Sequence, residues 1–256
     1  MTVVGVEADI LVLPLLAGVM VVATHVPLGR EVLRRGIIFI DLAVAQIAGL
    51  GVLAALSMGW DAGGWETQAV AVISALLGAT LIRGYECYWP DIQEALIGIT
   101  FVLAAAAGLL LLAGNPHGAE HLSGLLAGQL LWVNVDELLT AAAAYLPVLV
   151  VWYWLGPGRL RFYLLFAVTV TVSVQLVGVY LVFSSLIIPA VAIRRLRGIV
   201  AIAAGYGLGV TAFAAGLLCS LWFDWPAGPA VVWMLALTGM IFGFLVSLSS
   251  QGKQVE

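Results

Sequence analysis

Apolar residues in this chain gather into blocks about twenty residues long, and this feature limits the possible folds more than any other. A helix needs about 20 apolar residues to cross a hydrocarbon layer about 30 Å thick. Because 63% of the residues are hydrophobic and only 9% are charged, we expect an all-α polytopic membrane protein. Residues 1–256 would form a single transmembrane domain. The blocks lie at about 8–28, 36–58, 67–83, 93–114, 138–155, 162–181, 199–221 and 230–249.

Basic and acidic residues separate onto opposite ends of these predicted spans. If the N-terminus lies outside, every Lys and Arg faces the cytoplasm, at Arg30, Arg34, Arg35, Arg83, Arg159, Arg161, Arg194, Arg195, Arg197 and Lys253. The outer connections then contain only acidic charges, at Glu7, Asp9, Asp61, Glu66, Glu120, Asp136, Glu137 and Asp224. Because Lys and Arg concentrate in cytoplasmic loops, the sequence predicts an N-out, C-in topology.

Two further apolar stretches, 122–133 and 182–193, are too short to cross a bilayer alone at about 1.5 Å per residue. We interpret them as re-entrant or broken helices buried against protein. An N-out, C-in chain needs an odd number of crossings, so one of the two must cross. We favour 182–193, because it separates the span that ends near Leu181 from the cytoplasmic Arg194. The prediction is eight to nine transmembrane helices, one of them short.

ATP chemistry is not expected on this chain. The sequence has no G-x-x-x-x-G-K-[ST] run, and its only lysine is Lys253. Cys87 and Cys219 lie on opposite sides of the membrane in this topology, so they form neither a disulfide nor a thiolate metal site. Any energy from ATP must therefore come from a partner chain.

Asp41 interrupts the apolar run IIFIDLAVAQIAG, residues 37–49, and a charge inside a membrane span is costly. One interpretation is that Asp41 turns back to pair with Arg34 or Arg35. The other is that it lies on a cation path, since small side chains on its helix face let a helix or water approach. These small residues are Ala45, Ala48 and Gly49.

Gln46 is the second polar residue of this run. It is displaced from Asp41 by about 140° around the helix, at about 100° per residue. One helix therefore cannot present both side chains to the same ion. We regard Asp41 and Gln46 as candidate transport-path residues with different neighbours.

Imidazole and carboxylate groups gather in the predicted outer connections, where no Lys or Arg competes with a cation. They belong to His117, Glu120, His121, Asp136 and Glu137. This combination suits zinc and tolerates manganese or iron, so the residues could capture a metal. A solvated polar turn is the alternative, because Asn, Pro and Gly at 115, 116 and 118 are ordinary turn residues.

The residues His117, Glu120 and His121 also spell H-x-x-E-H, the signature of inverted zinc peptidases. That motif needs a helix, whereas Pro116 and Gly118 place its start at the edge of one. An intramembrane zinc peptidase is therefore a less favoured alternative.

Pro189 lies inside the run SSLIIPAVAI, residues 184–193, where it interrupts helical hydrogen bonding. Ser184 and Ser185 directly precede it and could bond to the groups that it frees. The result would be a kinked helix or a broken helix that lines a gate.

Polar residues punctuate five apolar stretches in a characteristic order: residues 28–51, 94–112, 119–138, 173–196 and 223–232. The most specific are LGREVLRRGIIFIDLAVAQIAGLG and SVQLVGVYLVFSSLIIPAVAIRRL, followed by the turn in FDWPAGPAVV. In these stretches the sequence resembles the permease subunits of bacterial ABC importers for zinc, manganese and iron.

This resemblance implies a multi-pass protein of the bacterial cytoplasmic (inner) membrane. It also implies a pore formed with a second permease chain, cytoplasmic ABC ATPase subunits, and an extracytoplasmic metal-binding protein. The transported divalent metal, zinc by expectation, would be cargo, with no permanent cofactor. Asp41 falls at the acidic position of the family.

The sequence departs from the family at two places. Many relatives have a histidine near the aspartate, where this chain has Ala45 and Gln46. Relatives also have a longer cytoplasmic loop that docks on the ATPase, where this chain has only GPGRLR, residues 156–161. Coupling could instead use the inner segment 83–94, or the chain could be a regulatory or scaffold protein that no longer transports. The docking candidates in that segment are Arg83, Tyr85, Glu86, Trp89 and Asp91.

Overall fold

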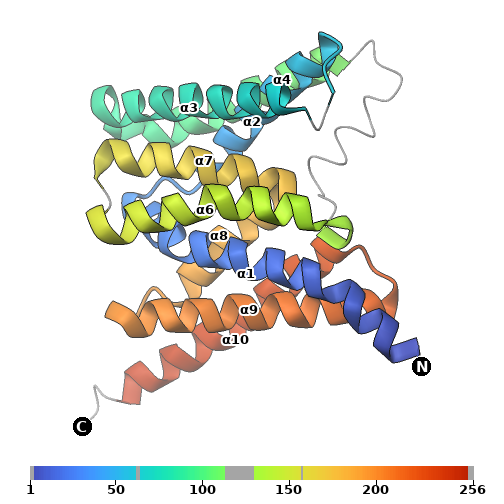
Figure 1. Ribbon diagram of the computed structural model, residues 1–256. Coiled ribbons are helices and arrows are strands. Elements are labelled where there is room, and N and C mark those ends of the chain that lie inside the picture. The colour runs from blue at the N-terminus through green and yellow to red at the C-terminus, as the bar shows by residue number, and fades with distance from the viewer. Residues whose placement is uncertain (1–2, 62–63, 113–129, 157, 253–256) are drawn as a thin grey trace.

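The computed structural model describes residues 3–61, 64–112, 130–156 and 158–252, and this part of the chain is entirely helical (Figure 1). It contains nine α-helices, two short 3-10 helices and no strand. The first helices are α1 (Val3–Arg35), α2 (Ile40–Ser57), α3 (Trp65–Tyr88), η1 (Pro90–Ile92) and α4 (Gln93–Leu112). After the gap come η2 (Leu130–Trp132), α6 (Val135–Leu155), α7 (Arg159–Val177), α8 (Val179–Ala192), α9 (Gly198–Phe223) and α10 (Ala227–Gly252).

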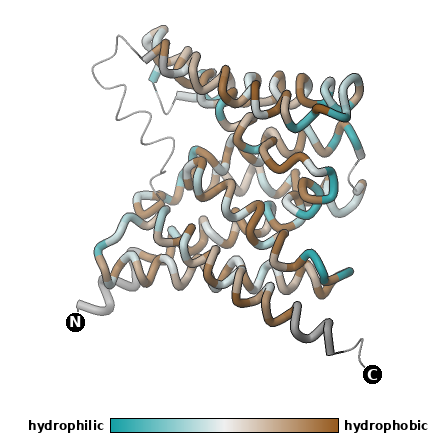
Figure 2. Tube along the Cα trace, turned by 180° about the vertical axis from the view of Figure 1, so that it is seen from behind, coloured by the Kyte–Doolittle hydropathy of each residue, from teal (hydrophilic) through white to brown (hydrophobic). Residues whose placement is uncertain are grey.

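Eight of these helices are long and apolar enough to cross a membrane, and α8 is a shorter apolar helix of 14 residues. The prediction of eight to nine spanning helices with one short member is therefore confirmed. The start of α1 and the end of α10 lie at opposite ends of the bundle (Figure 1). Hydrophobic residues dominate along the helices, whereas the more hydrophilic segments lie mainly at helix ends (Figure 2).

The helices form two packed groups with α7 between them (Figure 1). In one group, α2 packs against both α3 and α4. In the other, α8 packs against α1 and α10, and α9 packs against the same two helices. Helix α7 contacts α3 on one side and α6 and α8 on the other, so it connects the groups.

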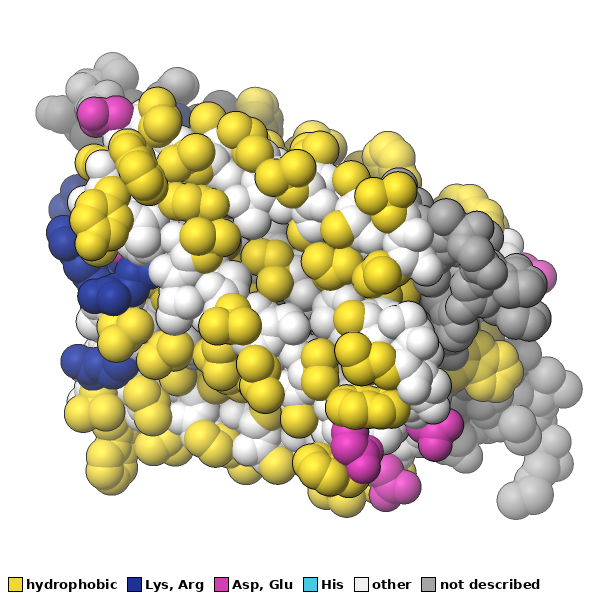
Figure 3. Space-filling view, turned by 90° about the horizontal axis from the view of Figure 1, so that it is seen from above, with side chains coloured by type: hydrophobic (Ala, Val, Ile, Leu, Met, Phe, Trp, Pro, Cys, Tyr) yellow, Lys and Arg dark blue, Asp and Glu magenta, His cyan; other side chains and the backbone are white. Residues whose placement is uncertain are grey.

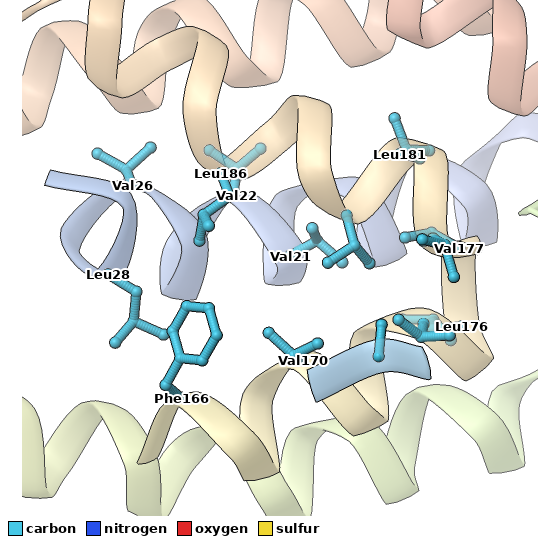
Figure 4. Close-up of a cluster of buried hydrophobic side chains, with 14 of the residues drawn as sticks. Val21, Val22, Val26, Leu28, Phe166, Val170, Leu176, Val177, Leu181 and Leu186 are labelled. Carbon is cyan, nitrogen blue, oxygen red and sulfur yellow. The ribbon is translucent and has the colours of Figure 1, made fainter. Parts of the chain in front are cut away.

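The centre of the bundle is filled by large side chains of α1, α7 and α8 (Figure 4). Phe166 and Val170 of α7 face Leu28 and Val21 of α1, and Leu186 of α8 lies close to α1 as well. Gly29 lets α1 approach α8 this closely, because a β-carbon at Gly29 would collide with the backbone oxygen of Leu186. A small residue is thus needed where these two helices cross.

Several predicted boundaries were wrong, and glycines explain two of the differences. The helix break after α7 lies at Gly178, with φ of 84°, and not near Leu181. The first helix continues through Pro27 to Arg35 before Gly36, with φ of 70°, turns the chain toward α2. Only glycine adopts such positive φ angles at little cost, so both turns form at these positions. Of the expected re-entrant stretch 122–133, residues 122–129 lie outside the described part.

The charged residues lie at the two ends of the bundle. Figure 3 shows Lys and Arg side chains gathered at one end and most of the visible Asp and Glu side chains at the opposite end, with hydrophobic side chains between them. Acidic side chains also lie at the basic end, where Glu31 and Glu86 pair with arginines. The hydrophobic band matches a surface that contacts lipid.

Candidate functional site

Asp41 lies in the first turn of α2 and is almost completely buried, with 1% of its surface exposed. Among the residues that the structure describes, neither carboxylate oxygen has a hydrogen-bond partner. The backbone N–H groups of Asp41 and Leu42 are close enough to interact with the carboxylate, but they do not reach hydrogen-bond geometry. A buried carboxylate without a partner is costly, which favours a functional role.

Arg34 and Arg35 do not pair with Asp41, contrary to the first sequence interpretation. Both bind Glu31, Arg34 at 2.6 Å and Arg35 at 2.7 Å, one turn earlier on α1. Arg35 also forms an ion pair with Glu86 of α3 at 3.1 Å. The reason is the turn at residues 36–39, which makes Asp41 part of a new helix and leaves the arginines to partners on α1 and α3.

Glu94, in the first turn of α4, reaches the residues just before α2. Its Oε1 accepts a hydrogen bond from the backbone N–H of Phe39 at 3.2 Å, just before α2 begins. Its Oε2 is buried and has no hydrogen-bond partner in the described part of the chain. Sequence reasoning missed this pair, because nothing in the sequence indicates that residues 39 and 94 meet.

Asp41 and Gln46 lie on different faces of α2, as their spacing predicts. Asp41 shares the buried face with Ala45 and Ala48. Gln46 and Leu42, which are one turn apart, line a hollow of about 550 Å³ between α2, α4, α8 and α10. The polar side chain of Gln46 therefore faces open space, whereas Asp41 is turned into the protein.

Ser184 lines the same hollow as Gln46, from the side of α8. Other lining residues are mostly aromatic or aliphatic, and they include Tyr180, which sequence reasoning missed. A second hollow of about 600 Å³ shares Leu42 and Phe101 with the first and extends to residues 39 and 95. The two neighbouring hollows thus extend along α2 from Gln46 to Phe39, just before its first turn, and neither Asp41 nor Glu94 is among the described residues that line them.

Helix α8 is continuous across Pro189, and its serines do not bond where the sequence suggested. Proline 189 cannot donate to the carbonyl of Ser185 four residues earlier. The hydroxyl of Ser184 donates instead to Tyr180 O at 2.8 Å, and that of Ser185 to Val182 O at 3.0 Å. Both hydrogen bonds thus go to carbonyl oxygens of the preceding turn of α8. Ser184 still lines the hollow. The assignment of Ser184, Ser185 and Pro189 to a gate stays a prediction.

The predicted outer metal-capture residues are described only in part. His117, Glu120 and His121 lie outside the described residues. Glu137 accepts a hydrogen bond from Asn134 N at 3.1 Å and caps the start of α6, next to the exposed Asp136. Within the described ranges, no three His, Cys, Asp or Glu side chains are arranged to hold a metal ion.

The predicted docking residues of the inner segment differ in their contacts and in their exposure. Glu86 and Tyr85 bind other helices, through the ion pair with Arg35 and a 3.0 Å hydrogen bond to Thr100. Arg83 is half-buried, and its Nε has no hydrogen-bond partner within the described ranges. Trp89 and Asp91 are exposed in the connection between α3 and α4. The connection between α6 and α7 consists of residues 156–158 alone.

Comparisons with known proteins give consistent matches along almost the whole chain. The model of the ABC 3 transport family matches residues 7–156 and 158–247. The high-affinity zinc uptake system membrane protein ZnuB of Haemophilus influenzae is 24% identical over 252 residues, which cover 88% of this chain and 93% of that protein. The structure of PsaBC from Streptococcus pneumoniae in complex with Fab matches with a TM-score of 0.73 and 22% identity, covering 93% of this chain and 95% of that one.

Proposed function

Since the chain belongs to the ABC 3 transport family, we propose that it is the permease subunit of an ABC importer that moves zinc into the cell. The family makes it a membrane component of a metal transporter. That the transported metal is zinc is our proposal. Its support is the similarity to ZnuB, a zinc uptake protein. Manganese and iron are the competing cargoes, because imidazole and carboxylate ligands tolerate these metals as well.

The observation that carries this proposal is the buried, unpartnered carboxylate of Asp41. An ionised group in a spanning helix is costly, and such groups mark ion pathways. The neighbouring hollows along α2 supply space for a path, with Gln46 and Ser184 as weak polar contacts. Weak contacts suit transport, because the cation must leave each site again.

The proposed assembly contains partners that supply the missing functions. Cytoplasmic ATPase subunits would hydrolyse ATP, a second permease chain would complete the pore, and an extracytoplasmic metal-binding protein would deliver zinc. In the proposed N-out, C-in orientation in the bacterial inner membrane, the arginine-rich end faces the ATPase. The exposed Trp89 and Asp91 are the docking residues of our proposal, because only residues 156–158 connect α6 to α7.

Uptake of radioactive zinc by cells that carry this chain as their only high-affinity zinc permease tests the proposal. Asp41→Asn keeps the shape of the side chain and removes its charge, and we expect uptake to fall to background. Glu66→Gln is the matched control, because Glu66 also lies in a first helical turn but is exposed. Normal uptake by Asp41→Asn, at equal membrane abundance, would remove the observation on which the proposal rests.

The short connection between α6 and α7 favours a second candidate, a regulatory membrane protein that no longer transports. The two candidates differ in their partners. A permease should co-purify with an ATPase subunit at near-stoichiometric yield after gentle extraction. Loss of the ATPase, under conditions in which a related permease retains it, would favour the regulatory protein.

A further inference from the structure

A third hollow, of about 410 Å³, opens at the arginine-rich end of the bundle and shares no lining residue with the two hollows along α2. Four elements supply its walls: the last turns of α1, the end of α6, the end of α8 and the start of α9. Helices α6, α8 and α9 each pack against α1, so the hollow lies where their inner ends converge. The proposed metal path does not use it.

The charged residues around this hollow are mostly basic: three arginines, Arg30, Arg34 and Arg194, and one acid, Glu31. Both carboxylate oxygens of Glu31 are occupied, because Arg34 donates to each at 2.8 and 2.6 Å and Arg35 donates to one at 2.7 Å. Arg30 is half-buried, and its side chain has no ion-pair or hydrogen-bond partner among the described residues. One nitrogen of Arg194 donates to a backbone carbonyl of α8 at 2.8 Å. The hollow is therefore positive and offers guanidinium donors to an anion.

The other lining residues are apolar. They are Pro27, Leu33, Trp152, Ala190, Leu196 and Ile202. Tryptophan near the end of a spanning helix is typical of the level at which lipid headgroups lie. Arg30 lies five residues before the end of α1, or about 7.5 Å along the helix, at the border between the hydrophobic band and the arginine-rich end. The hollow thus combines phosphate-binding groups with aliphatic and aromatic surface at headgroup depth.

We propose that this hollow binds the phosphate headgroup of an anionic phospholipid, which in the proposed orientation belongs to the cytoplasmic leaflet. A guanidinium binds two phosphate oxygens through parallel hydrogen bonds, and Arg30 has all of its donors available. Basic pockets between spanning helices on the cytoplasmic side suit acidic lipid headgroups. The apolar lining and the depth favour a lipid over free phosphate, because a free anion gains nothing from aliphatic walls. A bound lipid would hold the inner ends of the four helices together.

Native mass spectrometry of the purified full-length chain with added lipid tests the site. Phosphatidylglycerol is the anionic probe, and phosphatidylcholine with the same acyl chains is the zwitterionic one. We expect one phosphatidylglycerol per chain, bound at least tenfold more tightly than phosphatidylcholine. High salt should weaken this preference, because it screens the arginines.

Arg30→Gln is the informative variant, because it removes the charge without breaking a contact within the protein. Binding of phosphatidylglycerol should weaken about fivefold, the factor expected from one arginine near a membrane surface. Arg159→Gln is the matched control: Arg159 is exposed in the first turn of α7, directly after the end of α6, and does not line the hollow. This variant should bind the lipid as the unchanged chain does.

Several results would overturn the inference. These are equal binding of the two lipids, unchanged binding by Arg30→Gln, and displacement of phosphatidylglycerol by inorganic phosphate, which would assign the hollow to a free anion. A lower yield of co-purified ATPase with Arg30→Gln, at unchanged lipid binding, would make the hollow a protein-docking surface instead.

Thermal unfolding in detergent without lipid identifies a variant that misfolds. Arg194→Gln should weaken lipid binding to a similar extent, and it replaces Arg30→Gln in the comparison if that chain does not fold. None of these measurements depends on zinc uptake, so the lipid site and the proposed function can fail separately.

Discussion

Replacing Arg35 with Gln should destabilise the chain far more than the same change at Arg34, although both arginines bind Glu31. Arg35 connects three helices at the arginine-rich end of the bundle. It binds Glu31 of α1 at 2.7 Å and Glu86 of α3 at 3.1 Å, and its guanidinium lies 4.5 Å from the ring centre of Phe162 in α7. Its side chain is 12% exposed, whereas that of Arg34 is 68% exposed.

The expected magnitude follows from these contacts. Removing one partner of a buried ion pair costs about 3–5 kcal/mol, because the other charge is left buried. Glu31 keeps Arg34 and both acids retain some exposure, so we expect a loss of about 2–4 kcal/mol in the free energy of unfolding for Arg35→Gln. For Arg34→Gln the loss should be about 0–1 kcal/mol, as for other exposed ion pairs.

Unfolding of the purified chain in mixed micelles with increasing dodecyl sulfate measures this difference, and tryptophan fluorescence is a suitable signal. The unchanged chain, the Arg35→Gln variant and the Arg34→Gln variant would be compared under identical conditions. Equal stabilities of the two variants would refute the reasoning, because the argument depends on the difference in burial. A loss in Arg34→Gln alone would mean that the exposed pair supports the fold.

Three further changes test other parts of the account. Gly216→Ala should lower the free energy of unfolding by about 1–3 kcal/mol, because a β-carbon would collide with the backbone of Val231. Gly207→Ala is the control, because a β-carbon at Gly207 meets no atom within 4 Å and should cause no such loss. Thermal unfolding of the two variants measures the difference. Gln46→Leu should reduce zinc uptake severalfold without loss of stability if the hollow beside α8 conducts the metal, and unchanged uptake would exclude this role. Trp89→Ala should lower the yield of co-purified ATPase if the exposed turn between α3 and α4 is the docking surface; an unchanged yield would point to another inner connection.

The sequence was most informative where a single physical requirement dominates. Blocks of about twenty apolar residues predict spanning helices, and the gathering of Arg at one end of the predicted spans matches one end of the structure. The position of Gln46 relative to Asp41 also followed from the helical period. These features depend only on residues close together in the chain.

Contacts between distant residues could not be predicted in this way. The partner of Phe39 is 55 residues away, and the ion pair of Arg35 with Glu86 spans 51 residues. Of the two interpretations of Asp41, the pairing with Arg34 or Arg35 was wrong, because Gly36 ends α1 and turns the chain and the arginines bind Glu31 and Glu86 instead. The sequence prediction placed the break before α8 near Leu181, whereas it lies at Gly178. Several apolar residues surround Gly178, so hydropathy does not indicate a turn there.

ATP-driven zinc accumulation in proteoliposomes is the measurement that tests the central claim most directly. The vesicles would contain this chain together with the ATPase subunit that co-purifies with it, and the metal-binding protein would be supplied on the outer side. The account predicts that zinc accumulates only with ATP and not with the Asp41→Asn chain. Hydrolysis of ATP by the intact complex without any entry of zinc, manganese or iron would contradict it.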